Sequence, residues 1–579
     1  MRYLALATDY DGTLAHHGRV APRTIEALEQ LAATGRRLVL VTGRELDDLI
    51  GIFPEIERFH LVVAENGALL YDPATRERQV IAPAPHAAFV AELERRGVAP
   101  LSVGASIVAT VHPNETVVLE VIRDLGLELQ VIFNKGAVMV LPASINKATG
   151  LQAALKKLGL SPHNVVAVGD AENDHALLDL VEYSAAVANA VPMLKAHADR
   201  TLDRPHGEGL VELIESMLAN DLATPAQSSR HQVLLGTRGT GEEVGMPTAG
   251  VNVLVAGTSG SGKSTLATGV LERLAKLAYQ FCVIDPEGDY EDFPDAIGLG
   301  GADRAPGVDE VLTALEKVGT NVVINLIALP LADLPGFFSS LLPGLQALRA
   351  KTGRPHWVLV DETHHLLPTD WEPPSAVLAR DLTGMIYVTV HPEWIAPEVL
   401  VNIDVVTALG VSPEKTIASF CRAARIDPPA TPRSELEPGE AVAWLRSTGE
   451  PPFKLKVAPS HSDRRRHRRK YAAGELPPDR SFYFRGPEGK LNLRAQNLML
   501  FQQIADGVDD ETWLHHVHAG DYSAWIRGCI KDETLAALVS AVEEDAGLAA
   551  DESRRRVKKA IEEHYTLPEE GIAKAVIPS

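Results

Sequence analysis

Two carboxylates directly follow the first apolar segment of this chain. Residues 4–8 (LALAT) run into Asp9 and Asp11, which are spaced i, i+2 in the sequence DYDGT. If the chain stays extended there, both side chains point the same way, at a strand end where open α/β sheets bind their ligands. One aspartate could attack phosphorus and form an aspartyl-phosphate, and the other could protonate the leaving oxygen and then activate water. Clustered carboxylates that act on phosphate also favour Mg²⁺.

Three later segments carry side chains that suit a phosphorylated ligand. Thr42 follows a second apolar strand, in residues 39–44 (VLVTGR). Lys147 precedes an amphipathic helix, and Asp170 and Asp174 follow a third strand in residues 166–174 (VAVGDAEND). Because short apolar strands alternate with helical stretches over this region, we expect an α/β fold with a parallel sheet, in which these strand ends lie at one edge.

In order and spacing, these four segments resemble the motifs of the haloacid dehalogenase superfamily over roughly residues 1–217. The details are similar to the subgroup with an α/β cap inserted between the second and third motifs, here residues 72–135 after the turn at 65–68 (ENGA). That subgroup includes sugar phosphatases and phosphoglycolate phosphatases. The resemblance implies a Rossmann-like core and a phosphatase.

The resemblance also implies a role for each motif residue. Asp9 would be the nucleophile and Asp11 the general acid/base, while Thr42 and Lys147 would hold the phosphoryl oxygens. Asp170, helped by Asp174, would complete a Mg²⁺ site with Asp9 and the carbonyl of Asp11. The acid at position 11 implies a phosphomonoesterase, with a mutase or an inactive relative as the alternatives. Cationic residues of the cap could meet an anionic substrate or simply lie on the surface: Arg76, Arg78, His86, His112 and Lys135.

A second phosphate-binding element lies in the middle of the chain. The apolar residues 251–256 lead into the P-loop at 257–264 (GTSGSGKS), and a helical pattern begins at 265. In this strand–loop–helix context, backbone N–H groups and the helix N-terminus cradle the phosphates of a nucleotide. Lys263 would reach the β- and γ-phosphates, and Ser264 would hold Mg²⁺. The predicted nucleotide-binding residues are Gly257, Thr258, Ser259, Gly260, Ser261, Gly262, Lys263, Ser264 and Thr265.

The apolar residues 356–360 end in Asp361 and Glu362, a Walker B arrangement. Asp361 would bind the metal ion and Glu362 would polarise an attacking water, which favours ATP hydrolysis over phosphoryl transfer. Residues 281–290 and 385–392 resemble those of the HerA/VirB4-type ATPases, which are related to the FtsK DNA pumps. This resemblance implies a ring-shaped homo-oligomer with an arginine supplied in trans, for which Arg422 and Arg425 are candidates. The family usually has glutamine where this chain has His391, and this domain lacks the family's usual N-terminal β-barrel.

Length and composition predict a multidomain globular protein. The 579 residues suggest three or four domains, and 45% hydrophobic residues supply sizeable cores. A net charge of −22 argues against a wholly cationic nucleic-acid coat. Three dispersed cysteines, no cationic leader with an apolar stretch and no membrane-length apolar run indicate a protein of the reducing cytoplasm. The expected divisions are a phosphatase at 1–217, linkers at 218–232 and 458–477, an ATPase at 233–457 and a helical domain at 478–579.

Two segments allow more than one interpretation. The basic run at 463–470 (DRRRHRRK) is either a solvated linker or a contact to a phosphate backbone. In the C-terminal region, His515, His518 and Asp521 could bind a metal ion, but nearby aromatic residues fit a small helical core equally well. The C-terminal region resembles a small helical domain that is attached to other enzymes, and a docking or regulatory module is the default.

Three functions are compatible with these features. The first is a Mg²⁺-dependent phosphatase of a small metabolite, with an ATPase module that regulates or assembles it. The second is a nucleic-acid machine in which a HerA-like motor presents phosphorylated ends to the phosphatase. The third is a kinase–phosphatase for polynucleotide ends, against which Glu362 argues. The inserted cap and the acidic charge favour the first.

Overall fold

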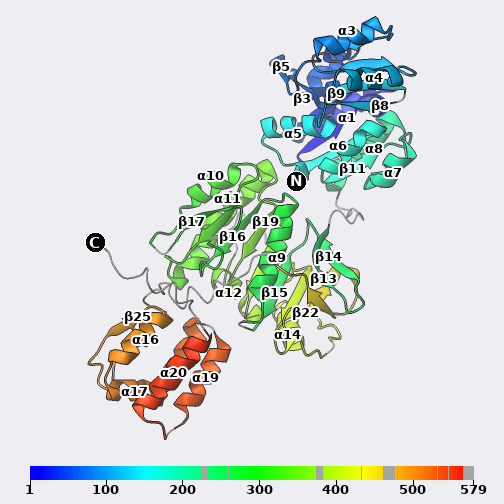
Figure 1. Ribbon diagram of the computed structural model, residues 1–579. Coiled ribbons are helices and arrows are strands. Elements are labelled where there is room, and N and C mark those ends of the chain that lie inside the picture. Colours follow the sequence, from blue (N-terminus) through cyan, green and yellow to red (C-terminus); the bar gives the residue numbers. More distant parts are fainter. Residues whose placement is uncertain are drawn as a thin grey trace. The chain divides into compact units, whose positions relative to one another are not determined.

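The computed structural model contains two compact units (Figure 1). Unit 1 comprises residues 1–232 with the segments 315–319 and 345–356, and unit 2 comprises the remaining chain to residue 579. The structure describes residues 1–134, 136–222, 232–258, 260–291, 293–301, 303–372, 383–431, 433–460, 476, 478, 480–530, 532–545 and 547–564. Within these residues, no helix combines the length and apolar character that a membrane crossing needs.

The N-terminal core is one eight-stranded sheet in the order β12-β11-β10-β1-β2-β3-β4-β5. The six strands from β12 to β3 are parallel, whereas β4 and β5 extend the sheet in antiparallel fashion. The strands are β1 (Ala5–Thr8), β2 (Arg37–Val41), β3 (Leu61–Ala64), β4 (Leu69–Asp72), β5 (Glu77–Val80), β10 (Val165–Gly169), β11 (Tyr183–Ala186) and β12 (Arg200–Thr201). The helices are α1 (Pro22–Ala33), α2 (Leu46–Ile52), α5 (Lys147–Leu158), α6 (His175–Leu180), α7 (Pro192–His197) and α8 (His206–Asn220).

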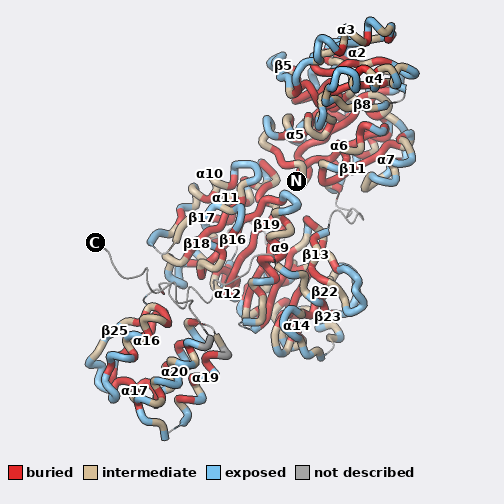
Figure 2. Tube along the Cα trace, in the orientation of Figure 1, coloured by how far each residue is buried: buried red, intermediate tan, exposed pale blue. Residues whose placement is uncertain are grey.

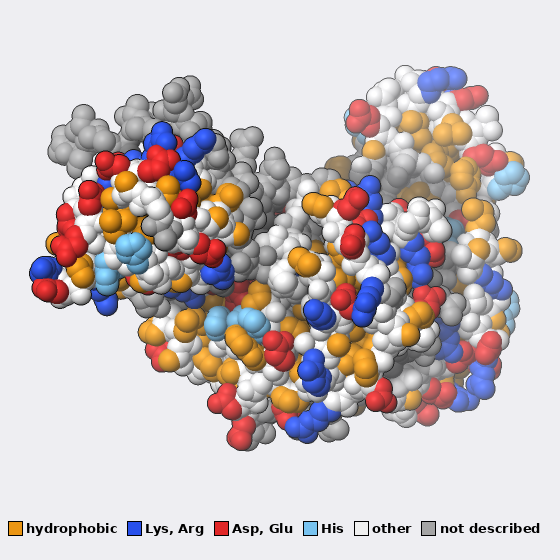
Figure 3. Space-filling view, turned by 90° about the horizontal axis from the view of Figure 1, so that it is seen from below, with side chains coloured by type: hydrophobic (Ala, Val, Ile, Leu, Met, Phe, Trp, Pro, Cys, Tyr) orange, Lys and Arg blue, Asp and Glu red, His pale blue; other side chains and the backbone are white. Residues whose placement is uncertain are grey.

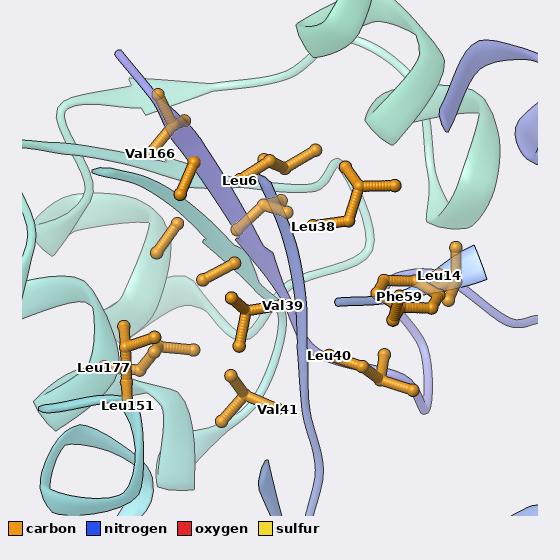
Figure 4. Packing of buried hydrophobic residues seen from close by; sticks show 14 of the residues in the cluster. Leu6, Leu14, Leu38, Val39, Leu40, Val41, Phe59, Leu151, Val166 and Leu177 are labelled. Atoms are coloured by element: carbon orange, nitrogen blue, oxygen red, sulfur yellow. The ribbon is translucent and has the colours of Figure 1, made fainter. Parts of the chain in front are cut away.

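The near-continuous apolar character of the central strands follows from burial on both faces of the sheet. Leu38 and Leu40 of β2 point to one face, and Val39 and Val41 point to the other, where Leu151 of α5 also lies (Figure 4). All five side chains are at most 1% exposed. Burial of each such side chain contributes about 1.5–3 kcal/mol. Figure 2 shows this burial as continuous red along the core strands.

The inserted cap is a four-stranded antiparallel sheet in the order β6-β7-β9-β8. Its strands are β6 (Ser102–Val103), β7 (Val108–Val111), β8 (Leu129–Asn134) and β9 (Ala137–Pro142), and its helices are α3 (Ala87–Arg95) and α4 (Glu115–Asp124). Because β4 and β5 pair with the core sheet, the cap begins after β5 and extends to the end of β9. This differs from the expected 72–135 at both ends.

The end of the N-terminal core also differs from the expected position. Helix α8 continues to Asn220, and Asp221 after it forms an ion pair with Arg36 at 2.8 Å. The first residues of the stretch expected as a linker therefore belong to the core. Residues 223–231, the rest of that stretch apart from Leu222 and Gln232, lie outside the described residues.

The P-loop domain is built on an eleven-stranded sheet in the order β14-β13-β23-β22-β21-β15-β20-β19-β16-β18-β17. The seven strands from β21 to β17 are parallel, and β22, β23 and β13 continue the sheet in antiparallel fashion. The strands are β13 (Gln232–Thr237), β14 (Glu243–Pro247), β15 (Val253–Gly257), β16 (Phe281–Asp285), β17 (Ala296–Gly300), β18 (Asn321–Asn325), β19 (Trp357–Val360), β20 (Met385–Thr389), β21 (Val405–Leu409), β22 (Glu440–Leu445) and β23 (Phe453–Val457). The longer helices are α9 (Lys263–Lys276), α10 (Val308–Glu316), α11 (Leu334–Thr352) and α14 (Pro413–Ala423).

The C-terminal region is mostly helical, as expected. A short hairpin of β24 (Phe482–Phe484) and β25 (Leu493–Ala495) precedes α16 (Leu498–Gly507), α17 (Asp510–Ala519), α18 (Asp521–Trp525), α19 (Glu533–Glu543) and α20 (Ala550–His564). Its core is aromatic, with Phe484, Phe501, Trp513 and Tyr522 each fully enclosed. The stacked Trp513 and Tyr522 rings lie 4.5 Å apart, within the range in which aromatic pairs stabilise a core.

Candidate active sites

Three buried carboxylates meet at one edge of the N-terminal eight-stranded sheet. Asp9 follows β1, and Asp170 and Asp174 follow β10, which pairs in parallel with β1 so that Thr8 lies opposite Val168. One oxygen from each of the three side chains lies within 4.8 Å of the others, and all three residues are at most 4% exposed. Hard oxygen donors in this arrangement suit a divalent cation such as Mg²⁺.

Lys147 lies between two of these carboxylates. Its Nζ donates to Oδ1 of Asp9 at 2.6 Å and to Oδ1 of Asp174 at 2.5 Å. Burial lowers the pKa of Lys147, but the Asp174 and Asp9 carboxylates more than compensate, so the pKa lies above its usual value. The lysine therefore stays charged and offsets part of the negative charge of the cluster.

Burial dominates the electrostatics of Asp9. The pKa of this carboxyl is raised to about 8, chiefly by burial and also by Asp174 and Asp170, while Lys147 acts in the opposite direction. A cation beside Asp9 favours its ionised form, and only the ionised form is a nucleophile. The position is thus suited to a carboxylate that is ionised when a cation binds.

Neighbouring polar groups hold the two other acids in place. Oδ1 of Asp170 accepts from the Thr13 hydroxyl at 3.2 Å. Oδ2 of Asp174 accepts from the backbone N–H groups of Asp170 and Ala171 at 2.9 and 3.0 Å. Asp174 thus bonds Lys147 with one oxygen and the turn after β10 with the other.

Asp11 occupies a different environment from Asp9. It is not one of the three clustered carboxylates, and its side chain is 38% exposed. The Arg44 guanidinium donates to both of its oxygens, at 2.6 and 2.9 Å, and also contacts Asp48. The second acid of the pair is therefore more exposed to solvent than Asp9.

Thr42 follows β2 and is almost fully enclosed, at 1% exposed. Its N–H donates to the carbonyl of Val63, and its hydroxyl accepts from the N–H of Arg44 at 3.1 Å. The next residue, Gly43, lies against the cap, because a Cβ added there would be 3.4 Å from Sδ of Met139. Met139 of the cap therefore covers the loop after β2, and the sequence analysis did not identify this residue.

The cationic cap candidates do not gather at this site. Arg78 forms an exposed ion pair with Asp47, and His112 pairs with Glu115 three residues later. Arg76 and His86 are exposed, and Lys135 lies outside the described residues. Arg44, Asn66 and Asn173 contact the motif residues or one another there instead, and of these only Arg44 and Asn173 lie within motifs that the sequence had marked.

The P-loop has the expected strand–loop–helix form. Helix α9 begins at Lys263, and the Lys263 Nζ donates to the carbonyl of Thr258 at 2.9 Å. Gly260 and Gly262 have φ values of 73° and 94°, in the left-handed region that favours glycine. Ser264 is half-buried and Thr265 exposed, in the first turn of α9, whereas Ser259 lies outside the described residues.

The Walker B acids follow β19, two strands from β15. Asp361 is 3% exposed, and burial raises its pKa well above the usual value, with Glu362, Asp289 and Asp285 adding to the effect. Glu362 has a φ of 41°, a strained conformation of the kind that clusters at functional sites. The Asp285 carboxylate accepts from three N–H groups of the following turn, including that of Glu287.

A network of hydrogen bonds joins the Walker B segment to the end of β20. The buried Thr389 Oγ1 lies 3.1 Å from Nδ1 of His364, and it accepts from the N–H of His391 at 3.0 Å. The His391 ring stacks on Trp394 with 3.7 Å between ring centroids, and its Nδ1 lies 3.2 Å from Glu393. Thr389 thus takes a linking position that the sequence reasoning did not assign to it.

The described C-terminal histidines do not form a metal site. Among the described residues, the only group of three or more potential metal ligands with closely spaced ligand atoms is that of Asp9, Asp170 and Asp174. Instead, His516 is buried, its Nδ1 lies 2.6 Å from Asp521 and its Nε2 accepts from the N–H of Arg485. His516 therefore has a structural role, in which it joins Asp521 to the backbone of Arg485. The basic run at 463–470 lies outside the described residues.

Comparisons with known proteins match both of these domains to families. The family model of haloacid dehalogenase-like hydrolases matches residues 6–106 and 115–214, and that of the helicase HerA central domain matches residues 251–350. A phosphoglycolate phosphatase of Methanothermobacter thermautotrophicus is 30% identical over 224 residues, which is 37% of this chain and 98% of that protein. One of Haloarcula marismortui is 32% identical over 36% of this chain and 95% of that protein.

A solved haloacid dehalogenase-like hydrolase from Bacteroides thetaiotaomicron is 20% identical, with a TM-score of 0.34, over 37% of this chain and 99% of that chain. The parallel sheet, the clustered acids and the P-loop define an enzyme with two phosphate-handling domains. The chain belongs to the haloacid dehalogenase-like hydrolases through its N-terminal domain, a phosphatase-type hydrolase fused to a HerA-like ATPase domain.

Proposed function

We propose that the N-terminal domain is a Mg²⁺-dependent phosphomonoesterase that acts on a small phosphorylated metabolite. The observation that carries this proposal is the buried cluster of Asp9, Asp170 and Asp174 with Lys147 in direct contact. The similarity of this domain to nearly the full length of two phosphoglycolate phosphatases favours phosphoglycolate as the substrate, with a sugar phosphate as the alternative.

The residues suit a two-step hydrolysis. An oxygen of Asp9 would attack phosphorus while the bond to the leaving oxygen breaks, and Asp11 would give that oxygen a proton. Asp11 would then take a proton from water, which attacks the aspartyl-phosphate, releases phosphate and restores Asp9. Thr42 and Lys147 would hold the phosphoryl oxygens through both steps.

The carboxylates fit Mg²⁺, because each supplies a hard oxygen donor and Lys147 offsets only part of their charge. Asp9, Asp170 and Asp174, with the Asp11 carbonyl, would hold the ion. When bound, it supplies positive charge that neutralises the phosphate. Met139 of the cap lies over the loop at Gly43, and a cap that covers the site would favour a compact substrate over a duplex end.

For the second domain we propose ATP hydrolysis. Residues 257–265 would bind the phosphates, with Lys263 on the β- and γ-phosphates and Ser264 and Asp361 at Mg²⁺. Glu362 would polarise the attacking water. Assembly of a homo-oligomer through this domain, and a cytoplasmic location, complete the proposal.

The match to the HerA central domain favours one alternative, a nucleic-acid-processing ATPase whose phosphatase domain removes phosphate from the ends of nucleic acids. Such proteins bind phosphate backbones through clustered lysine and arginine. On the face shown in Figure 3, lysine and arginine are interspersed with aspartate and glutamate rather than gathered in one basic surface. The net charge of −22 favours the metabolite over the nucleic acid.

The test measures phosphate release with Mg²⁺ from phosphoglycolate, sugar phosphates, and oligonucleotides with 3′- or 5′-phosphates, each with and without ATP. We expect turnover of one small ester and none of the oligonucleotides. Turnover of oligonucleotide ends, especially if it depends on ATP, would replace the metabolic function by the nucleic-acid function. If no phosphomonoester is turned over, the phosphatase proposal is wrong.

A further inference from the structure

The turn at Glu65, Asn66 and Gly67, after β3, connects the cap to the phosphate site. Glu65 and Asn66 have φ values of 51° and 52°, a left-handed conformation that asparagine tolerates but that is uncommon for glutamate. The Glu65 N–H donates to the carbonyl of Arg44 at 2.9 Å, and the Asn66 N–H donates to that of Thr42 at 3.0 Å. The turn is thus bonded to the loop that would hold the phosphoryl group.

The Glu65 side chain points away from that loop and binds the cap. Its Oε1 accepts from the N–H of Ala105 at 2.9 Å, and its Oε2 accepts from those of Ser106 and Ile107 at 2.8 and 3.2 Å. The residue is only 2% exposed. Three hydrogen bonds to an ionised acceptor are stronger than neutral ones, so this one carboxylate fastens the cap loop to the core.

The shape of the cap loop matches this contact. The Gly104 N–H donates to the carbonyl of Ile107, which closes a tight turn around the carboxylate. A Cβ added at Gly104 would lie 2.9 Å from Cδ of Glu65, so a larger residue there would displace the glutamate. Ile107 in turn packs with Met139 of the cap, the residue that roofs Gly43.

The other side of the turn lies against the motif residues. A Cβ added at Gly67 would be 1.9 Å from the carbonyl oxygen of Asn146, next to Lys147. Oδ1 of Asn66 accepts from Nδ2 of Asn173 at 3.0 Å, while Nδ2 of Asn66 is buried with no hydrogen-bond partner in the structure. Because Asn66 shares its turn with Glu65, the contact between Glu65 and the cap also fixes the Asn66 side-chain amide beside the loop after β2.

We propose that Glu65 is a positioning residue that holds the cap down on the phosphate site and thereby restricts the enzyme to small phosphate esters, while Asn66 on the same turn presents its amide to the bound substrate. This inference rests on the proposed phosphatase function. An ester with a bulky leaving group requires the loop at 104–107 to be released, whereas a small one is enclosed with the loop fastened.

The test compares the full-length protein with Glu65→Gln and Glu65→Ala, and with Glu120→Gln as the matched control. Glu120 lies on the outer helix α4 of the cap, where it pairs with Arg96. For each protein, kcat/KM is measured with phosphoglycolate and with 4-methylumbelliferyl phosphate. We expect the ratio of the two values to shift at least tenfold towards the bulky ester in both Glu65 variants, and to stay unchanged in the control.

Hydrogen exchange supplies a readout that needs no activity. The amides of Ala105, Ser106 and Ile107 should exchange slowly in the wild-type protein and much faster in Glu65→Gln. An equal loss with both esters would mean a merely structural role and overturn the proposal, as would fast exchange in the wild type. If the wild type hydrolyses neither ester although these amides are protected, the phosphatase proposal fails while the clamp stands.

Discussion

Nζ of Lys147 lies 2.6 Å from Oδ1 of Asp9, and both side chains are almost fully enclosed. The two residues are separated by most of the phosphatase domain in sequence, and the cap is inserted between them. The contact joins the start of α5 to the end of β1 and places the amine directly beside the carboxylate that we propose as the nucleophile.

Replacement of Asp9 tests the independence of the two domains. Asp9→Asn keeps the size of the side chain but removes the nucleophilic charge, so phosphate release should fall at least ~1,000-fold. ATP hydrolysis should be unchanged, because the P-loop residues are untouched. Phosphate release and ATP turnover are measured on the same preparation, with the exposed Asp47→Asn as control. Full phosphate release by Asp9→Asn would show that the nucleophile lies elsewhere.

Removal of Lys147 should make folding depend on Mg²⁺. In Lys147→Ala, the buried Asp9 and Asp174 lose their common cation, which costs about 3–5 kcal/mol for a broken buried pair. A divalent cation bound by the same carboxylates would recover part of that loss. The measurement is thermal unfolding in EDTA and in Mg²⁺.

The control for this experiment is Lys157→Ala, on the same helix but at the surface, where Lys157 pairs with Glu77. It should lose little stability and respond to Mg²⁺ like the wild type. If Mg²⁺ raises the unfolding temperature of Lys147→Ala no more than that of the control, the carboxylates do not form the metal site.

The acid cluster could be predicted from sequence, whereas the clamp at Glu65 could not. Asp9 and Asp170 each follow an apolar strand, and parallel strand ends converge at one edge whatever the loops do. Glu65, by contrast, binds backbone N–H groups of Ala105 to Ile107. Nearly every residue type has a backbone N–H group, so the sequence does not show which residues a carboxylate will bind in this way.

The start of the cap was misplaced for a related reason. All four residues of β5 (Glu77–Val80) are exposed, so the strand lacks the alternation that marks a half-buried strand. It extends the core sheet through its backbone hydrogen bonds to β4. From sequence alone, β5 is therefore assigned to the inserted cap rather than to the core sheet.

Replacement of Lys263 should strongly reduce ATP hydrolysis and leave phosphatase activity, the converse of the effect expected for Asp9→Asn. Lys263→Ala removes the ammonium expected on the β- and γ-phosphates, so ATP hydrolysis should fall at least ~100-fold while phosphatase activity persists. Lys276→Ala, at the other end of α9, is the control. A parallel loss of phosphatase activity in Lys263→Ala alone would mean that nucleotide binding governs the N-terminal site, and would exclude two independent activities.

Thr389 should matter more for ATP turnover than for ATP binding. Its hydroxyl contacts both His364, two residues after Glu362, and the backbone of His391. Thr389→Val keeps the shape but loses both hydrogen bonds, which should cost about 1–3 kcal/mol of folding stability. The Walker B segment and the His391 loop would then lose their common anchor, and kcat for ATP should fall several-fold with little change in KM.

The matched control is Thr407→Val, because Thr407 is equally buried on β21 and donates to the carbonyl of Leu254 at 3.2 Å. Steady-state ATP hydrolysis and chemical denaturation are measured for both variants. We expect a comparable loss of stability in the two proteins but a selective loss of kcat in Thr389→Val. Equal ATPase rates at matched folded fractions would show that the link through Thr389 supports the sheet alone and has no part in hydrolysis.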